Sequence, residues 1–251
     1  MRHLLSDWHP VSKRLRSSPT IALFLDFDGT LARLHPRPEQ VSLDGSMRGT
    51  LAVLARSPHF RIWVVSGRRQ ADVRSRVGVS GIRYLGLHGW EGRGRALPEE
   101  TRRCLPALSH RLNTCLRGLA GVWIEDKQYA FSIHYRGVAP GNVRRAGTIV
   151  ERIVAPCSER FRIQQGKSVW EVLPRDLSDK GEAVRQELAS LRGPSTAVYL
   201  GDDQTDEPAF AALRSGITVR VGGPARSRAK YRLGGVAEVR TFLHKLRAEF
   251  A

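Results

Sequence analysis

The sequence lacks any long apolar run. No stretch approaches the roughly 20 uninterrupted apolar residues that a membrane-spanning helix needs. Residues 1–19 carry scattered charges and a tryptophan where a signal peptide would have an apolar centre. We therefore expect a cytoplasmic protein with no membrane partner, and we predict that residues 1–19 are a short N-terminal leader.

Cysteine is also scarce. The chain has Cys104, Cys115 and Cys157, an odd number without a closely spaced pair. This pattern argues against a disulfide framework and a CxxC metal site, and it fits a reducing compartment.

Lysine is a minor part of a large positive charge. The net charge is +17, and only six of the 41 basic residues are lysines. A basic surface attracts nucleic acids and phosphorylated small molecules alike. The basic residues are spread along the chain, without a long basic run or interleaved aromatic residues, so we expect no nucleic-acid partner.

Short apolar segments alternate with helical patterns over much of the chain. Buried strands are predicted at 21–27, 61–66, 82–87, 196–202 and 217–222, and helices at 46–55, 69–77 and 180–191. Each strand segment stops at Gly, Ser or Asp, as buried parallel strands often do. The alternation predicts an α/β fold, a Rossmann-like, doubly wound parallel sheet.

The middle of the chain breaks this alternation. Helical patterns at 105–119 and 142–155 are each followed by a predicted hairpin, at 122–136 and 161–174. We interpret this segment as an inserted α+β cap, with Pro106 and Pro174 as hinges. The predicted domains are a core of residues 20–105 and 175–251 and a cap of residues 106–174.

The segment IALFLDFDGTL (21–31) drives an apolar strand into Asp26 and Asp28. In an open parallel sheet, ligands bind beyond the carboxyl ends of the strands. Two unpaired carboxylates repel each other and call for a cation, and Mg²⁺ suits carboxylate and phosphate oxygens. The alternative is a loop in which the aspartates act as caps, but the apolar strand before DFDGTL favours chemistry.

Two further segments offer groups for an anion. The next strand ends in VVSGRR (64–69), where Ser66 and Gly67 present a hydroxyl and a backbone N–H before a helix. Lys180 begins the helix of SDKGEAV (178–184). Taken alone, the SGR of residues 66–68 is as often a plain strand-to-helix turn. A lysine at the position of Lys180 is normally solvated.

The segment YLGDDQTDEPAF (199–210) places several acids directly after a strand. Helix capping would use one or two of them, so metal binding is the better interpretation. Asp202 is the predicted metal ligand. Asp206, one turn on, and its neighbour Asp203 are predicted to bind the metal or a group beside it, such as Lys180.

Together these segments resemble the haloacid dehalogenase-like phosphatases: DxDGT, a strand-terminal Ser, a helix Lys and GDxxxD. The resemblance implies that Asp26 attacks phosphorus and that Asp28 is the general acid, then base. It implies Mg²⁺ held by Asp26, Asp28 and Asp202. Ser66, Gly67 and Lys180 would bind the phosphoryl group.

Further segments are similar to trehalose-6-phosphate phosphatases, from about Ile21 to near Leu246. They are GLHGWE (86–91), VWIEDKQYAFSIHYR (122–136) and QQGKSVWEVLP (164–174). The resemblance implies that these residues bind the substrate: Arg68, His88, Glu125, Lys127, Arg136 and Glu171. The chain departs from the family around Pro174, where Leu173 and Arg175-Asp176-Leu177 replace the usual residues.

We therefore expect a Mg²⁺-dependent phosphatase that converts trehalose 6-phosphate to trehalose and phosphate, acting as a monomer on a small-molecule substrate. One alternative is another capped sugar phosphatase, of the sucrose-phosphate or mannosyl-phosphate type. Another is a catalytically silent phosphatase-like binding module, which would usually have lost an acid that this chain keeps. On their pattern alone, the polar cap residues are slightly better explained as solvent-facing strand positions, and only the family resemblance favours substrate binding.

Overall fold

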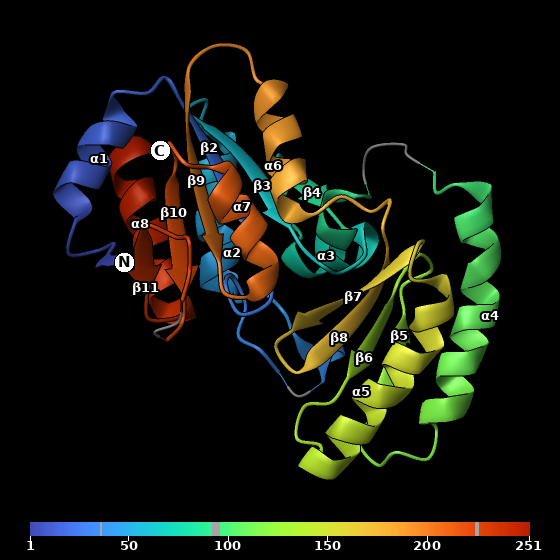
Figure 1. Cartoon of the computed structure of the whole chain (residues 1–251). Helices are drawn as coiled ribbons and strands as arrows, with labels where there is room; N and C mark the ends of the chain where they lie inside the picture. The colour runs from blue at the N-terminus through green and yellow to red at the C-terminus, as the bar shows by residue number, and fades with distance from the viewer. Residues whose placement is uncertain (36, 92–95, 224–225) are drawn as a thin grey trace. The chain divides into compact units, whose positions relative to one another are not determined.

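The computed structural model describes residues 1–35, 37–91, 96–223 and 226–251. The chain forms two compact units, one of Met1–Arg93 with Ser178–Ala251 and the other of Gly94–Leu177 (Figure 1). None of the helices within the described ranges is long and apolar enough to span a bilayer.

The first unit is built on a seven-stranded sheet in which every pair of neighbouring strands is parallel. In spatial order the strands are β1 (Arg2–His3), β11 (Tyr231–Leu233), β10 (Ile217–Val221), β9 (Ser195–Gly201), β2 (Thr20–Leu25), β3 (Phe60–Val65) and β4 (Arg83–Leu85). The predicted parallel α/β sheet is thus confirmed. From β2 the sheet extends in two directions. On one side lie β3 and β4, and on the other side lie β9, β10, β11 and β1.

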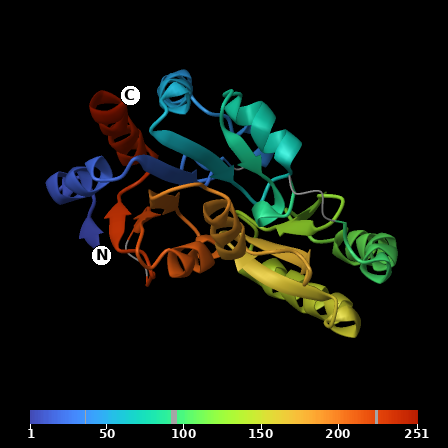
Figure 2. The same cartoon turned by 90° about the horizontal axis from the view of Figure 1, so that it is seen from above.

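Helices cover both faces of this sheet, as Figure 2 shows for the first unit. The helices are α1 (Trp8–Arg16), α2 (Gly45–Arg56), α3 (Gln70–Val77) and α8 (Val236–Phe250) on one face, and α6 (Lys180–Ala189) and α7 (Glu207–Ala212) on the other. Successive side chains of a strand point to opposite faces. Leu23 of β2 accordingly packs with the first group, and Phe24 packs with the second. Both faces of the strand are therefore buried.

Residues 1–19 differ from the predicted leader. Strand β1 pairs with β11, and Leu4, Val11 and Leu15 lie in the same apolar core as α8. The apolar spacing of Val11 and Leu15 puts both on one face of α1, and burying that face stabilises the helix against the sheet. The segment is part of the first unit.

The second unit is a four-stranded antiparallel sheet in the order β5-β6-β8-β7. Its strands are β5 (Trp123–Asp126), β6 (Phe131–His134), β7 (Phe161–Gly166) and β8 (Val169–Pro174), and its α-helices are α4 (Glu99–Leu116) and α5 (Pro140–Val154). A Cβ on Gly147 of α5 would lie 3.3 Å from the ring of Trp170 on β8. The sheet face that carries Trp170 therefore packs against α5.

The boundary between the units differs from the predicted hinge residues. The division falls at Arg93/Gly94 and at Leu177/Ser178. Pro106 lies inside α4, where it removes one backbone hydrogen bond to the preceding turn. The helix continues through it because Leu105, Leu108 and Leu112 are buried along one side.

Candidate functional site

The predicted acids follow adjacent strands of the parallel sheet. Leu25 of β2 is in register with Val64 of β3 and with Leu200 of β9. The residues just beyond these positions, which include Asp26, Ser66 and Asp202, therefore emerge at one edge of the sheet. This is the edge at which parallel α/β sheets bind ligands.

Three carboxylates and one ammonium group form a buried cluster at this edge. Asp26, Asp202 and Asp206 each offer an oxygen, and these oxygens lie within 4.8 Å of one another. The Nζ atom of Lys180 donates to Asp26 Oδ1 and to Asp206 Oδ1, at 2.7 Å in both cases. Lys180 is only 2% exposed. Its predicted place beside Asp26 and Asp206 agrees with this geometry.

The cluster has an excess of negative charge. Burial raises the pKa of the Asp26 carboxyl well above its ordinary value, although Lys180 acts to lower it. Burial alone would lower the pKa of Lys180, but Asp206 and Asp26 outweigh it and raise that pKa well above its ordinary value. Lys180 therefore favours its charged form, and within the part of the chain that the structure describes this cluster groups one ammonium with three buried carboxylates.

The residues present fit a divalent cation. Carboxylate oxygens grouped this closely are the ligands that Mg²⁺ prefers, and a further positive charge would keep Asp26 ionised. The backbone also approaches the acids closely. A Cβ on Gly29 (φ +84°) would lie 2.2 Å from Asp202 Oδ2, and one on Gly201 would lie 2.2 Å from Asp206 Cγ. Any side chain at either glycine would displace an acid of the cluster.

Asp206 is held on both oxygens. Besides Lys180, the Tyr199 hydroxyl donates to Oδ1 at 2.8 Å, and the Asp203 backbone N–H donates to Oδ2 at 2.9 Å. Asp203 in turn caps the short helix η4 (Gln204–Asp206). Asp206 thus orients Lys180, and Tyr199 is a contributor that its position inside an apolar strand gave no reason to expect.

The Asp28 carboxylate lies outside the cluster of three acids. It accepts two hydrogen bonds from Arg68, from Nε to Oδ2 at 2.7 Å and from Nη2 to Oδ1 at 2.8 Å. The expectation that Asp28 binds metal remains a prediction for this side chain. Arg68, predicted as a substrate ligand, is engaged with Asp28 and with Asp72.

The segment after β3 is tied to the segment after β4. The Ser66 hydroxyl accepts from the Arg68 N–H at 3.1 Å, and the Ser66 carbonyl accepts from the His88 N–H at 2.9 Å. Leu87 and His88 both have left-handed backbone angles, with φ of 46° and 60°. Such angles in two consecutive non-glycine residues indicate a conformation imposed by the surrounding contacts.

Glu91 holds this strained segment in place. Its carboxylate accepts from the Gln70 N–H at 2.5 Å, at the beginning of α3, and from Arg69 Nε at 3.2 Å. The family resemblance had drawn attention to HGWE without giving Glu91 a role. In the segment after β2, the Thr30 hydroxyl is fully buried and has no hydrogen-bond partner among the described residues.

The second unit gathers its polar groups on one sheet face. Glu125, Ser132 and Glu171 are paired across β5, β6 and β8, one register step from Trp170, so they lie on the face opposite α5. Lys127 Nζ donates to Glu171 Oε1 at 2.9 Å, and both residues are buried.

A second polar group lies further along this sheet face. Glu125 is 2.9 Å from His134, whose ring stacks on Trp123 at 4.0 Å. Arg136 is exposed, and its Nη2 atom donates to the Lys167 carbonyl at 3.5 Å.

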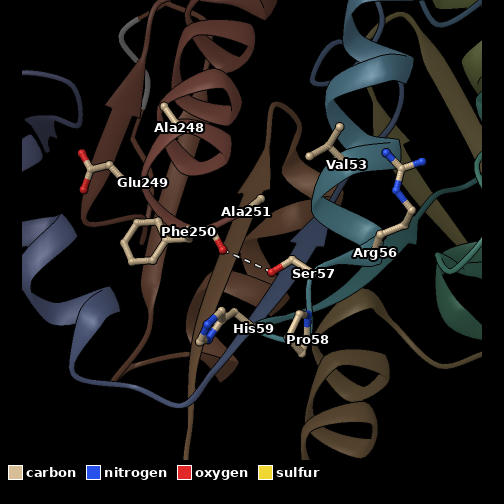
Figure 3. Close-up of a pocket in the computed structure, with 9 residues that line it drawn as sticks. All are labelled: Val53, Arg56, Ser57, Pro58, His59, Ala248, Glu249, Phe250 and Ala251. Carbon is tan, nitrogen blue, oxygen red and sulfur yellow. Dashed lines mark hydrogen bonds between the residues drawn. The ribbon is translucent and has the colours of Figure 1, made fainter.

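A surface pocket elsewhere in the first unit has no part in this chemistry. Figure 3 shows it between the segment just before β3 and the end of α8, with a volume of about 650 Å³. Ser57 lines this pocket, and its Oγ atom donates to the Phe250 carbonyl at 3.1 Å. The pocket is at the amino end of β3, whereas Asp26 and Asp202 follow the carboxyl ends of their strands.

Comparison with known proteins agrees with this geometry. The model of the trehalose-phosphatase family matches residues 24–233. The trehalose-6-phosphate phosphatase of Escherichia coli is 33% identical over 248 residues, which cover 94% of this chain and 90% of that protein. The solved C-terminal domain of the Candida albicans trehalose-6-phosphate phosphatase shares the fold, with a TM-score of 0.81, 21% identity and 94% coverage of both chains.

Other relatives are much longer proteins. An uncharacterised glycosyl hydrolase of Mycobacterium tuberculosis is 36% identical over 254 residues. That match covers 93% of this chain, but the chain spans only 19% of the length of the mycobacterial protein.

Proposed function

The chain belongs to the trehalose-phosphatase family, and from this premise we propose that it hydrolyses trehalose 6-phosphate to trehalose and inorganic phosphate. The observation that carries the proposal is the buried cluster of Asp26, Lys180, Asp202 and Asp206 at the carboxyl edge of the sheet. A silent binding module would have no need to keep a lysine paired with two buried acids, since buried ion pairs are costly to maintain.

In the first step, a carboxylate oxygen of Asp26 attacks phosphorus, and the bond between phosphorus and the sugar oxygen breaks. The departing sugar oxygen takes a proton from Asp28, so trehalose leaves as a neutral alcohol. Asp26 is then an aspartyl phosphate. Lys180 holds the Oδ1 atom of Asp26 at 2.7 Å and so fixes the direction of the nucleophile.

In the second step, a water molecule attacks the same phosphorus and gives a proton to Asp28. The bond between phosphorus and Asp26 breaks, which releases inorganic phosphate and restores the carboxylate. The Ser66 hydroxyl, the Gly67 N–H and Lys180 are the proposed donors to the phosphoryl oxygens in both steps. Donors fixed before reaction stabilise developing charge at little reorganisation cost.

We propose that Asp26 and Asp202 hold Mg²⁺, with Asp206 and Asp203 beside them. The excess of carboxylates over ammonium groups in the cluster supports this. When bound, the ion neutralises negative charge on the nucleophile and on the phosphoryl group.

Selectivity for the sugar is assigned to the second unit. The proposed ligands of the trehalose hydroxyls are Glu125, Lys127 and Glu171, with Arg136 of the second unit and His88 of the first as further candidates. The support is that Lys127 and Glu171 are buried and paired, with Glu171 on the sheet face opposite α5. Groups exposed only to solvent would have no reason to be so ordered.

We further propose that the protein acts as a monomer in the cytoplasm. The proposed catalytic residues all come from one chain, and the cysteines Cys104, Cys115 and Cys157 are free, which suits a reducing compartment.

A panel of phosphate esters tests the proposed function. Phosphate release is measured with trehalose 6-phosphate, glucose 6-phosphate and sucrose 6-phosphate, each with Mg²⁺ and again with a chelator. We expect trehalose 6-phosphate to give the highest kcat/KM, and the chelator to abolish turnover. Comparable rates on glucose 6-phosphate and trehalose 6-phosphate would overturn the substrate assignment.

A further inference from the structure

Arg68 is enclosed by acceptors of its own unit. Its Nε and Nη2 atoms grip both oxygens of Asp28, at 2.7 and 2.8 Å, and Nη2 also donates to the Pro38 carbonyl at 2.9 Å. Nη1 donates to Asp72 Oδ2 at 3.0 Å. A guanidinium has five N–H donors, and these contacts engage four of them. With its side chain only 9% exposed, Arg68 has little capacity left to bind a substrate.

The arginine is itself anchored by helix α3. Asp72 lies on the first turn of α3, and its other oxygen accepts from Arg76 Nε at 2.7 Å. The Arg76 Nη1 atom bonds the carbonyls of Glu39 and Val41, at 2.8 and 2.6 Å. A continuous series of charge-assisted hydrogen bonds therefore runs from the loop around Val41 through α3 and Arg68 to Asp28. Such bonds are short and directional, which suits them to fixing a side chain.

Asp28 needs this support because it has few constraints of its own. Its carboxylate is 29% exposed, and the chain turns sharply at Gly29, where φ is +84°. An aspartate on such a loop samples several rotamers unless a partner selects one. A bidentate arginine fixes both the position and the plane of a carboxylate. The Asp28 side chain is nevertheless partly accessible to solvent, as proton transfer requires.

We propose that Arg68 is a positioning residue for Asp28, with Asp72 holding Arg68 in place, and that it binds neither the phosphate nor the sugar. This inference rests on the proposed function, in which Asp28 gives a proton in the first step and takes one in the second. Arg68 acts on both steps only through Asp28. This assignment replaces the substrate contact that the family resemblance had implied for Arg68.

An aryl ester separates the possible roles of Arg68. p-Nitrophenolate leaves without needing a proton, so the first step with p-nitrophenyl phosphate does not depend on Asp28, whereas the second step still does. The kcat/KM value covers events only up to the first irreversible step. A positioning residue for Asp28 should therefore affect kcat for this substrate and spare kcat/KM.

The experiment compares the wild-type chain with Arg68→Lys, which keeps the positive charge and loses the bidentate guanidinium that donates to both oxygens of Asp28. For p-nitrophenyl phosphate we expect kcat to fall by about 100-fold, the lower end of what general acid–base catalysis supplies. We expect kcat/KM for the same ester to change less than about threefold, because Asp28 acts on this substrate only in the second step. Acid quenching should then recover phosphorylated chain in the variant at a higher level than in the wild type.

Asp72→Asn provides a second variant should Arg68→Lys fail to fold. Its side chain is one-third exposed and contacts Arg68 and Arg76. We expect the same pattern with a kcat loss of about tenfold, smaller than the roughly hundredfold cost of misplacing a reacting group by about 1 Å. Arg69→Lys is the matched control, since this neighbouring arginine is 44% exposed and pairs with Glu91. It should leave kcat and the phosphorylated fraction unchanged.

Two results would overturn the inference. A loss of kcat/KM as large as that of kcat, without accumulated phosphorylated chain, would make Arg68 a phosphate ligand. An unchanged kcat for the aryl ester, with a loss confined to trehalose 6-phosphate, would make it a sugar ligand. A wild-type chain that releases phosphate from neither ester would instead refute the proposed function, and with it the premise of this inference.

Discussion

The buried charges of the two units are assembled in different ways. In the first unit, Asp26, Lys180, Asp202 and Asp206 come from distant parts of the sequence and meet because parallel strands end at one edge. In the second unit, Lys127 lies in the turn after β5 and bonds Glu171 of β8, across the intervening strand β6 of an antiparallel sheet. A sheet edge concentrates groups at a point, whereas a sheet face spreads them over a surface.

In the proposed function, this difference separates reaction from recognition. A point at which a nucleophile, an ammonium group and metal-binding acids converge can act on one phosphorus atom. A face with spaced donors and acceptors can match the spaced hydroxyls of a disaccharide. Substitutions in the cluster of the first unit should therefore lower the turnover of every phosphate ester. Substitutions on the polar face of the second unit should lower turnover by an amount that depends on the substrate.

The largest expected effect is that of Asp26→Asn. An amide is a poor nucleophile, so turnover of every ester should fall by at least about 10⁴-fold, as for the loss of other covalent nucleophiles. Phosphate release and thermal unfolding are measured together, because folding should be retained. Residual turnover near the wild-type rate would exclude Asp26 as the nucleophile.

Lys180→Met should have the largest effect on stability. It leaves the buried carboxylates of Asp26 and Asp206 without their shared cation, and breaking a buried pair costs about 3–5 kcal/mol. Urea unfolding without divalent ions measures the loss. Lys13→Met on the exposed side of α1 is the control, with an expected change within about 0.5 kcal/mol. Equal unfolding midpoints for the two variants would mean that the cluster is not held by Lys180.

Glu171→Ala tests the dependence on substrate. Lost hydrogen bonds to a sugar cost about 1–3 kcal/mol, so kcat/KM for trehalose 6-phosphate should fall about 5- to 150-fold. Turnover of p-nitrophenyl phosphate should be retained. Glu100→Ala is the control, because Glu100 is an exposed residue of α4 that pairs with Arg160. It should leave kcat/KM unchanged for both substrates. Equal losses for both esters in Glu171→Ala would show that Glu171 supports the fold and does not contact the sugar.

The smallest expected effect compares two helix caps. Asp179 and Asp44 each accept a backbone N–H at 2.8 Å at the beginning of a helix, of α6 and α2 respectively. Either aspartate replaced by alanine should lose about 1 kcal/mol of stability. Only Asp179→Ala should also lower kcat, because Lys180 is the first residue of α6. If both variants kept the wild-type kcat, the cap would have no part in placing Lys180.

The gathering of Asp26, Lys180, Asp202 and Asp206 at the sheet edge could be predicted from the sequence because its signals are local. DFDGTL follows an apolar strand, Lys180 opens a helix, and GDDQTD follows another strand, so topology alone brings them together. The same reasoning failed for residues 1–19. Strand β1 has only two residues, and its partner β11 lies some 230 positions away, a distance that no local pattern reveals.

The partner of Arg68 was beyond sequence reasoning for a related cause. Asp72 follows at the i+4 spacing of a helix, but Arg68 lies before the first residue of α3. The direction of its guanidinium follows from partners in three separate segments, Asp28, Pro38 and Asp72, which only the folded chain brings together. Pro106 was likewise interpreted as a hinge, because proline usually ends a helix. In the structure α4 continues past Pro106, and the burial that stabilises the helix there is a tertiary effect that the local sequence does not reveal.

The most direct test of the account is to trap the phosphorylated side chain. The chain is mixed with trehalose 6-phosphate and Mg²⁺, quenched within a turnover, reduced with borohydride and mapped by peptide mass spectrometry. An acyl phosphate at Asp26 is reduced to homoserine, so we predict homoserine at that position and at no other aspartate. Turnover with no reduced residue at Asp26, or with the modification on another side chain, would contradict the account.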